Sequence, residues 1–279
     1  MRLIVSVLFV ASLWAHDASA AVLDRLRDSG VLKIGYREDA APFSYKNAIG
    51  EPAGYTVDLC RAVAAALKAQ LNLAAIAIDY VPVSAENRFE QVKAGKVDLH
   101  CGAATVTLSR REIVDFSQPV FIDGASVLFR GDGPQTFEDL KGKKVGVRAG
   151  TTTEMALWNT LQSLSVEAEV VAVTSHDDGL SQLESGAVSA YFADHAILAA
   201  LVLRAKAGDS LRLSKRYFTQ EPYALALPRG DSDFRLAVDR ALSRIYRSRA
   251  IGQIFAKAFG TAQPSDLLKA LFVISTLPE

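Results

Sequence analysis

The sequence has few cysteines and histidines and no excess of charge of either sign. Lysine and arginine together number 31, as do aspartate and glutamate, so the formal net charge is zero. This balance argues against a nucleic-acid partner, because proteins that bind nucleic acid usually carry a basic surface. The two cysteines and four histidines show no spacing typical of metal ligands. We therefore expect no nucleic acid, no metal and no other cofactor.

Long apolar runs are also missing, apart from one at the N-terminus. Residues 3–14 form an apolar run that is too short to span a bilayer, and residues 18–20 form the small-x-small cleavage signature Ala-Ser-Ala. This pattern predicts a secretory signal peptide over residues 1–20. No cysteine stands at the expected cleavage point, which argues against a lipid anchor. We expect residues 21–279 to form a soluble, exported protein.

The two cysteines are Cys60 and Cys101. In an exported protein such a pair is expected to form a disulfide. Cys60 lies in a predicted helix that could cover the predicted strand ending at Cys101, which favours the bridge. Two buried free thiols are the alternative, because the sequence does not give the Cα separation that a disulfide requires.

Strand and helix patterns alternate along the chain, with no low-complexity linker and no short repeat. A first β-α-β-α-β unit covers residues 31–101, and a similar unit covers residues 136–192. This order implies mostly parallel sheets covered by helices, which bind ligands at the carboxyl ends of their strands. An extended run is expected at 217–227. Four further helices are expected at 197–207, 234–246, 251–259 and 265–273.

Two similar units and a C-terminal return predict a two-lobed α/β fold. The chain would cross between the lobes near residues 126–131 and 217–224. We expect residues 21–128 and 221–279 to form the first lobe, and residues 129–220 to form the second. A body of this kind closes around its ligand by a hinge motion.

Residues 101–117 carry the strongest motif. A short strand runs into small and hydroxylated residues, where Thr105 offers a hydroxyl and Arg110 offers a guanidinium. An arginine can bind a carboxylate through two parallel hydrogen bonds, so this strand end suits a small zwitterion. A surface arginine at a turn is the alternative interpretation of Arg110.

A second motif covers residues 145–154, where a strand ends, a glycine turns and a helix begins. Thr151 and Glu154 have the spacing of a capping box. Capping alone could explain these residues. The same helix N-terminus also presents free N–H groups that suit an anion.

These two segments resemble those of periplasmic amino-acid-binding proteins, the family 3 solute-binding proteins of ABC importers. The resemblance implies the type II periplasmic binding protein fold, with two mixed sheets flanked by helices and joined by two crossing hinge segments. It further implies that Arg110 of one lobe and Thr151–Thr152 of the other hold the ligand α-carboxylate. Asp194 would hold the α-ammonium, together with the carbonyl of Ala103 and the hydroxyl of Thr105. A helix N-cap is the alternative role of Asp194.

Residues 35–45 and 83–89 resemble the corresponding segments of glutamate/aspartate-binding proteins. By this resemblance Arg37 and Arg88 reach the side-chain carboxylate of the ligand, and His176 falls at a ligand-contacting histidine. Taken singly, each could be a solvated, capping or surface-paired residue. Burying several cations in one cleft would cost free energy unless a dianionic ligand pairs with them.

The sequence departs from this subgroup at two positions. Ala103 stands where the subgroup tends to carry a serine, and Arg148 stands where it tends to carry a smaller hydroxylated residue. We expect the pocket to be tighter, more cationic or differently connected as a result.

The resemblance predicts a monomeric periplasmic protein that captures L-glutamate or L-aspartate and delivers it to an ABC permease. Another polar amino acid, a dicarboxylate or a sensing role are the alternatives among binding functions. Dehydratases with this fold exist, so an enzyme is the rival class, and fold alone does not decide. Apart from Asp194 and His176 we find no poised acid or base, and we expect no enzyme activity.

Overall fold

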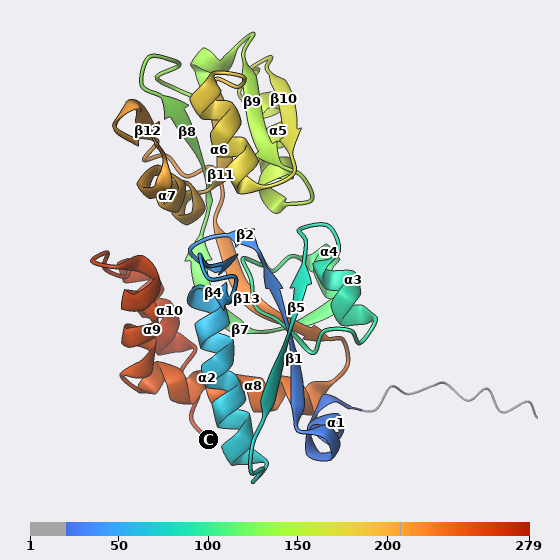
Figure 1. The fold of residues 1–279 in the computed structure, drawn as a ribbon. Helices are drawn as coiled ribbons and strands as arrows, with labels where there is room; N and C mark the ends of the chain where they lie inside the picture. The colour runs from blue at the N-terminus through green and yellow to red at the C-terminus, as the bar shows by residue number, and fades with distance from the viewer. Residues whose placement is uncertain (1–20, 207) are drawn as a thin grey trace, which may run out of the picture.

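The structure is a computed structural model that describes residues 21–206 and 208–279. The predicted signal peptide, residues 1–20, lies outside the described residues. Figure 1 shows two bodies, one above the other, connected by two segments of the chain. We call the lower body the first lobe and the upper body the second lobe.

The first lobe is built on a five-stranded mixed sheet in the order β5-β1-β6-β13-β7. β1 pairs in parallel with β5 and β6, whereas β13 pairs antiparallel to β6 and β7. The bounds are β1 (Val31–Arg37), β5 (Ala77–Val83), β6 (Leu99–His100), β7 (Val114–Asp123) and β13 (Glu221–Pro228). A small antiparallel sheet lies on its upper rim, formed by β2 (Asp39–Ala40), β3 (Ser44–Lys46) and β4 (Pro52–Ala53).

The second lobe repeats this plan with the strand order β10-β9-β11-β8-β12. β9 pairs in parallel with β10 and β11, and β8 pairs antiparallel to β11 and β12. The bounds are β8 (Ala125–Arg130), β9 (Lys144–Arg148), β10 (Glu169–Val173), β11 (Ala190–Asp194) and β12 (Leu211–Leu213). The limits given above for the two lobes stay a prediction.

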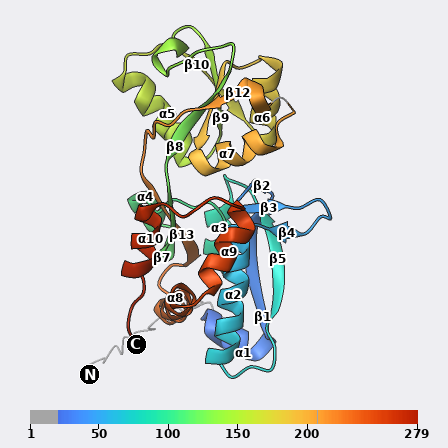
Figure 2. The ribbon, with the colours of Figure 1, turned by 90° about the vertical axis from the view of Figure 1, so that its left-hand side faces the viewer.

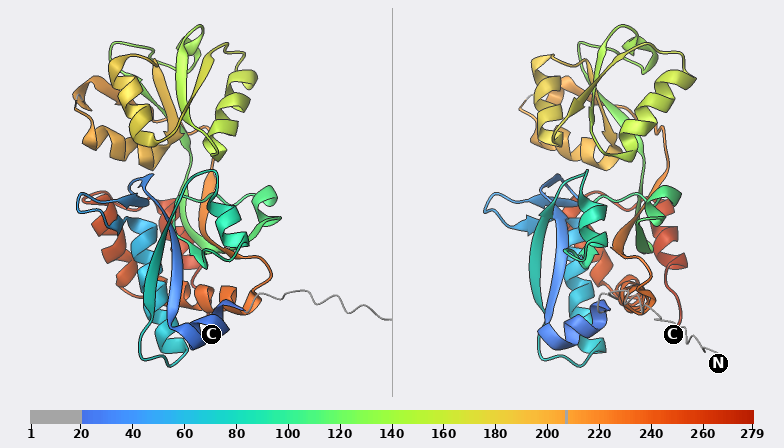
Figure 3. Two further views of the ribbon diagram at one scale, coloured as in Figure 1. Left: turned by 45° about the vertical axis from the view of Figure 1, so that its right-hand side comes forward. Right: turned by 90° about the vertical axis from the view of Figure 1, so that its right-hand side faces the viewer.

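Helices flank both sheets (Figures 2 and 3). Those of the first lobe are α1 (Val22–Ser29), α2 (Tyr55–Gln70), α3 (Arg88–Lys93), α4 (Leu108–Arg111), α8 (Ser232–Arg247), α9 (Ala250–Phe259) and α10 (Asp266–Ile274). The second lobe has α5 (Thr152–Ser163), α6 (His176–Ser185) and α7 (His195–Arg204), with 3-10 turns at Glu138–Leu140 and Gly208–Ser210. No helix within these described ranges is long and apolar enough to cross a membrane.

An aromatic cluster fixes the first lobe below its rim. Phe43 lies edge-on to Tyr55, Phe121 and Tyr223, at centroid distances of 6.4, 4.9 and 5.1 Å. Phe259 of α9 stacks on Phe121 at 5.4 Å. Full burial of each such ring stabilises the fold by about 1.5–3 kcal/mol. The cluster therefore joins the small sheet, the main sheet and the C-terminal helices into one support for the residues above it.

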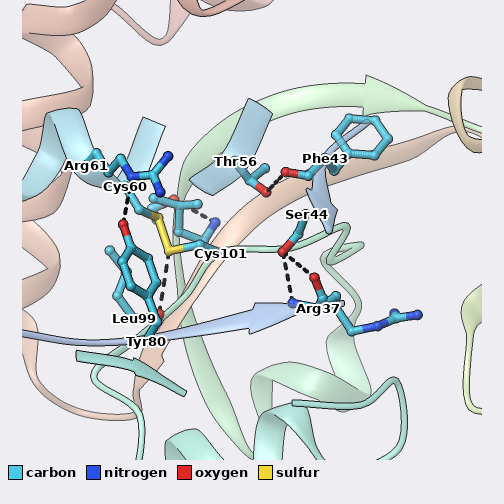
Figure 4. Close-up of a disulfide and its surroundings, with 11 residues drawn as sticks. Arg37, Phe43, Ser44, Thr56, Cys60, Arg61, Tyr80, Leu99 and Cys101 are labelled. Carbon is cyan, nitrogen blue, oxygen red and sulfur yellow. Dashed lines mark hydrogen bonds between the residues drawn. A yellow bond between two sulfur atoms is a disulfide. The ribbon is translucent and has the colours of Figure 1, made fainter. Parts of the chain in front are cut away.

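The disulfide between Cys60 and Cys101 is present, with a Cα–Cα distance of 6.4 Å. It fastens α2 to the residue that follows β6 (Figure 4). The segment that begins at Cys101 is the one expected to hold the zwitterion, so the bridge fixes the start of that segment to the core.

The two crossings lie side by side. Asp123 of β7 pairs directly with Glu221 of β13, and Gly124 follows before β8 begins. A Cβ on Gly124 would lie 2.1 Å from the carbonyl oxygen of Thr219, which is a clash with backbone. Only glycine lets the crossings approach this closely, so the hinge is a tight pair of strands.

Candidate functional site

The residues expected to bind a ligand gather where the two lobes face each other. β1 ends at Arg37 and β6 ends at His100 in the first lobe, and β9 ends at Arg148 and β11 ends at Asp194 in the second. The carboxyl ends of parallel strands are where open α/β sheets bind ligands. Both sheets therefore bring these edges together where the lobes meet, as the contacts Arg88–Gly150 and Thr105–Thr152 show.

A cationic group lines the first lobe. Arg37 is buried, and its backbone is held by hydrogen bonds to Ser44 (Figure 4). Its Nε donates to Asp39 over 2.7 Å. Arg88 is also buried, and its guanidinium lies 4.5 Å from the centre of the Phe89 ring. Its Nη1 donates to the carbonyl of Gly150 in the second lobe over 3.4 Å, whereas its Nε is buried without a partner. Burial, then repulsion from Arg110 and Arg37, lowers the pKa of Arg88.

His100 lies near Arg37 and Arg88, and the sequence interpretation missed it. Its side chain is fully buried, and neither ring nitrogen has a hydrogen-bond partner in the described chain. Burial and the neighbouring Arg88 and Arg37 lower its pKa well below the usual value, so the ring is neutral at pH 7. A Cβ on Gly102 would lie 2.8 Å from the ring, so glycine makes room for it. Its position at a strand end was the signal in the sequence.

Arg110 lies in the last turn of the short helix α4 and is partly buried. Its Nη1 donates to the carbonyl of Thr105 over 2.7 Å, and its guanidinium lies 5.0 Å from the centre of the Phe89 ring. Burial lowers its pKa, although the carboxylates of Glu221 and Asp194 oppose that effect. Ala103, in the same segment, is partly buried against the core.

Asp194 occupies the N-cap position of α7, but its side chain makes no capping hydrogen bond. The carboxylate of Asp123 accepts a hydrogen bond from the Ala196 N–H instead, over 3.1 Å. Asp194 is buried, and its Oδ1 has no hydrogen-bond partner among the described residues. Burial, followed by repulsion from Glu221 and Asp123, raises its pKa well above the usual value. The helix-capping interpretation of Asp194 is therefore wrong, and its carboxyl group is left facing the other acids.

Thr151 caps α5 as predicted, but the Glu154 carboxylate accepts from the Gly150 N–H and not from that of Thr151, so the capping box is incomplete. The two threonines at this turn differ. Thr151 accepts from the Glu154 N–H over 3.2 Å and donates to the Arg148 carbonyl over 2.7 Å, so it shapes the turn. Thr152 instead donates to Glu221 over 2.7 Å and lies 3.1 Å from the hydroxyl of Thr105. The hydroxyls of Thr105 and Thr152 thus meet across the two lobes.

Arg148 pairs with two carboxylates of the first lobe. Its Nη1 donates to Glu86 over 2.5 Å, and its Nε donates to Asp39 over 3.2 Å. Although partial burial raises the pKa of Glu86, the hydrogen bond from Arg148 outweighs it and lowers that pKa to about 2. The extra cation is therefore compensated by protein carboxylates of the first lobe.

His176 is the first residue of α6 and is buried. Its Nδ1 lies 2.8 Å from the Tyr191 hydroxyl, and Ser175, one residue earlier, caps the helix. Burial and the nearby Arg37 lower the pKa of His176 to about 3, so the ring is neutral. It therefore offers a hydrogen bond but no charge.

The sequence of this chain matches one family over most of its length. The model for bacterial extracellular solute-binding proteins, family 3, matches residues 32–261. The chain belongs to this family.

Its relatives and structural neighbours agree with the two-lobed fold. The glutamate/aspartate import solute-binding protein of Salmonella typhimurium is 30% identical over 91% of this chain and 88% of the relative. The L-glutamate/L-aspartate-binding protein of Pseudomonas aeruginosa is 31% identical over 93% of this chain and 86% of the relative. The crystal structure of an ancestral amino acid-binding protein, a precursor of cyclohexadienyl dehydratase, superposes with a TM-score of 0.75 at 26% identity, over 85% of this chain and 99% of that one.

The family 3 protein thus presents two oppositely charged regions to the space between its lobes. Arg37, Arg88 and Arg110 lie on the first-lobe side, and Asp194 and Glu221 lie toward the hinge. Such an arrangement can hold an anionic group and an ammonium group at the same time. No group of three or more acidic, histidine or cysteine side chains within the described ranges could hold a metal ion.

Proposed function

We propose that this protein captures an acidic amino acid, L-glutamate or L-aspartate, in the periplasm and delivers it to the membrane permease of an ABC importer. The observation that carries this proposal is the pair of buried cations, Arg37 and Arg88, which lie beside the neutral His100. Arg37 pairs with Asp39, whereas Arg88 has a buried Nε without a partner, and a buried cation is costly unless an anion pairs with it. The names of the two relatives above support the same ligand class.

The ligand would be divided between the two charged regions. Arg110 and the N-terminus of α5 at Thr151–Thr152 would hold the α-carboxylate, while Asp194, Thr105 and the carbonyl of Ala103 would hold the α-ammonium. Arg37 and Arg88 would pair with the distal carboxylate, and His176 would add a neutral hydrogen bond. Each charge-assisted hydrogen bond would contribute about 1.5–3 kcal/mol. The protein would act as a monomer that opens and closes at the paired crossings.

A thermal-shift screen of the ligand-free protein against the twenty amino acids tests this proposal. Glutamate or aspartate should stabilise the fold most, by about 2.7 kcal/mol at a hundredfold excess over the dissociation constant. If glutamine, histidine or arginine stabilises the protein more than either acid, the assignment of the distal pocket is wrong. Calorimetric titration then gives the affinity of the acid that binds.

A dehydratase-like enzyme is the second candidate. The buried carboxyl groups of Asp123 and Asp194 have raised pKa values, because burial and neighbouring carboxylates disfavour their ionised forms. A protonated carboxyl group can act as a general acid, and one structural neighbour is a dehydratase precursor. The bound amino acid is monitored by NMR during prolonged incubation with the protein. If it is recovered unchanged, this result counts against the enzyme candidate.

A further inference from the structure

Glu221 is a buried carboxylate at the centre of the hinge that none of the roles above uses. It is the first residue of β13, and only 3% of its surface is exposed. Its Oε2 accepts hydrogen bonds from Thr105 over 2.5 Å and from Thr152 over 2.7 Å. Its Oε1 accepts from Thr219 over 2.8 Å. One carboxylate therefore collects three threonine hydroxyls, from the first lobe, the second lobe and the crossing between them.

These contacts fix the direction of two hydroxyl groups in the site. An ionised carboxylate only accepts hydrogen bonds, and each hydroxyl has a single proton to donate. Thr105 and Thr152 each direct that proton to Glu221, so neither hydroxyl can donate to a ligand carboxylate. Their oxygens keep free lone pairs, which can accept a hydrogen bond from an ammonium. At α5 an anion is then left with the backbone N–H groups of the first turn.

The charges around Glu221 favour the same kind of group. Glu221 lies directly opposite Asp123 on the paired crossing strands, and both carboxyl groups repel that of Asp194. Arg110 is the cation that interacts with Glu221 and Asp194. Carboxyl groups therefore outnumber the arginine in this part of the site, and a primary ammonium placed among them would favour their ionised forms.

We propose that Glu221 is a positioning residue that fixes Thr105 and Thr152 as hydrogen-bond acceptors, so that the site requires an α-ammonium and rejects a dicarboxylate that lacks one. This inference rests on the proposed function and narrows its ligand class. A dicarboxylate without the amino group would place no donor against the two oriented oxygens. It would also leave the carboxylates near the hinge without a compensating cation.

The test compares glutamate with glutarate, which has the same carbon chain and two carboxylates but no amino group. Dissociation constants for both are measured by calorimetry with the parent and with Glu221→Gln. The introduced amide can donate its N–H to one threonine oxygen, which reverses that hydroxyl and removes the negative charge. We expect glutamate binding to weaken at least tenfold, whereas glutarate binding should change less than threefold or improve.

An equal loss for the two ligands would mean that Glu221 only supports the fold, and a parent that binds glutarate as tightly as glutamate would also overturn the inference. Glu138→Gln serves as the matched control, because Glu138 is an exposed carboxylate paired with Arg216 on the surface. It should leave both constants unchanged.

Two further measurements separate the possible failures. If Glu221→Gln does not fold, Thr152→Val removes one of the oriented hydroxyls and should lower the preference for glutamate by at least threefold; an unchanged preference overturns the inference. If the parent prefers a non-acidic amino acid, the proposed function is wrong. The ratio of the dissociation constants for that amino acid and its deaminated form, compared between the parent and Glu221→Gln, then decides the role of Glu221.

Discussion

Arg148 of the second lobe donates a hydrogen bond to Glu86 of the first lobe over 2.5 Å. The same guanidinium reaches Asp39 over 3.2 Å, so one side chain bridges two carboxylates across the space between the lobes. Asp39 in turn pairs with Arg37. The bridge therefore connects closure of the lobes to the cationic group that we assign to the distal carboxylate.

Replacing Arg148 by glutamine should shift the ligand-free protein toward an open form. Such ion pairs contribute about 1 kcal/mol when partly exposed, and Glu86 is about half exposed. That free energy corresponds to about a fivefold loss of affinity for glutamate, because the competent closed form is less populated. Small-angle scattering should show a larger radius of gyration. Arg130→Gln, which removes an exposed pair with Asp132, is the control, and equal scattering curves for the two variants would contradict the prediction.

Replacing Arg88 by alanine should impair glutamate binding far more than glutamine binding. Only the acid loses a charge pair, and loss of one partner of a buried pair costs about 3–5 kcal/mol, or more than a hundredfold in affinity. Glutamine binding should change little or improve, because its amide no longer faces a buried guanidinium. The measurement is the ratio of the two dissociation constants in parent and variant, and equal losses would show that Arg88 is structural.

Replacing Arg110 or Asp194 by alanine should abolish binding of every amino acid. Both residues are proposed to hold groups that all amino acids share, and each change would leave a charged ligand group buried without its partner, at a cost of several kcal/mol. Calorimetry with glutamate, aspartate and glutamine checks this. Binding within tenfold of the parent in either variant would refute the role of that residue.

Asp123→Asn should make the stability of the ligand-free protein fall less, or rise more, as the pH increases from about 4 to about 7. Burial raises the pKa of Asp123 to about 7 in the fold, whereas the unfolded chain releases this proton near pH 4. The folded state therefore keeps the Asp123 proton in this window, and this group alone makes stability fall as the pH rises, whereas the lowered pKa values of His100 and His176 act in the opposite direction. Melting temperatures of parent and variant measured at pH 5, 6 and 7 test the slope. Asp132→Asn, an exposed change, should keep the slope of the parent, and an Asp123→Asn slope equal to that of the parent would contradict the prediction.

Replacing both Cys60 and Cys101 by alanine should lower stability substantially. The bridge closes a loop with a sequence separation of 41 residues, and the chain-entropy model gives about 4 kcal/mol for a loop of that size. For a chain of this length the melting temperature should fall by roughly 10 °C. The parent treated with reductant should melt near the double variant. A parent that yields two free thiols by mass spectrometry without reductant would contradict the bridge.

Much of the architecture could be predicted because hydrophobic periodicity decides element type. The helix expected at 57–68 is present as Tyr55–Gln70, and the strand expected at 169–173 has those same bounds. The long strand Val114–Asp123 was not predicted. Its inward and outward positions do not alternate regularly, because it follows a bulged partner at Tyr223–Ala226. The tiny sheet of β2, β3 and β4 was also missed, since strands of two or three residues carry too little pattern.

The candidate site was less accessible to sequence interpretation. The resemblance indicated Arg110 and Asp194, because the residues around each of them resemble a segment of the family. His100 and Glu221 were missed, because a histidine within a strand and a glutamate before a proline have many ordinary explanations. The partners of Arg148 could not be foreseen either, since Asp39, Glu86 and Arg148 come from three separate segments that only the folded chain brings together.

The disulfide has a practical consequence for watching the hinge move. The chain contains two cysteines, and both are held in the Cys60–Cys101 bridge, so no free thiol remains. A cysteine introduced at exposed Lys93 of the first lobe and another at exposed Lys143 of the second would be the sole sites for maleimide dyes. Energy transfer between such dyes would report lobe closure in real time while the Cys60–Cys101 disulfide stays intact.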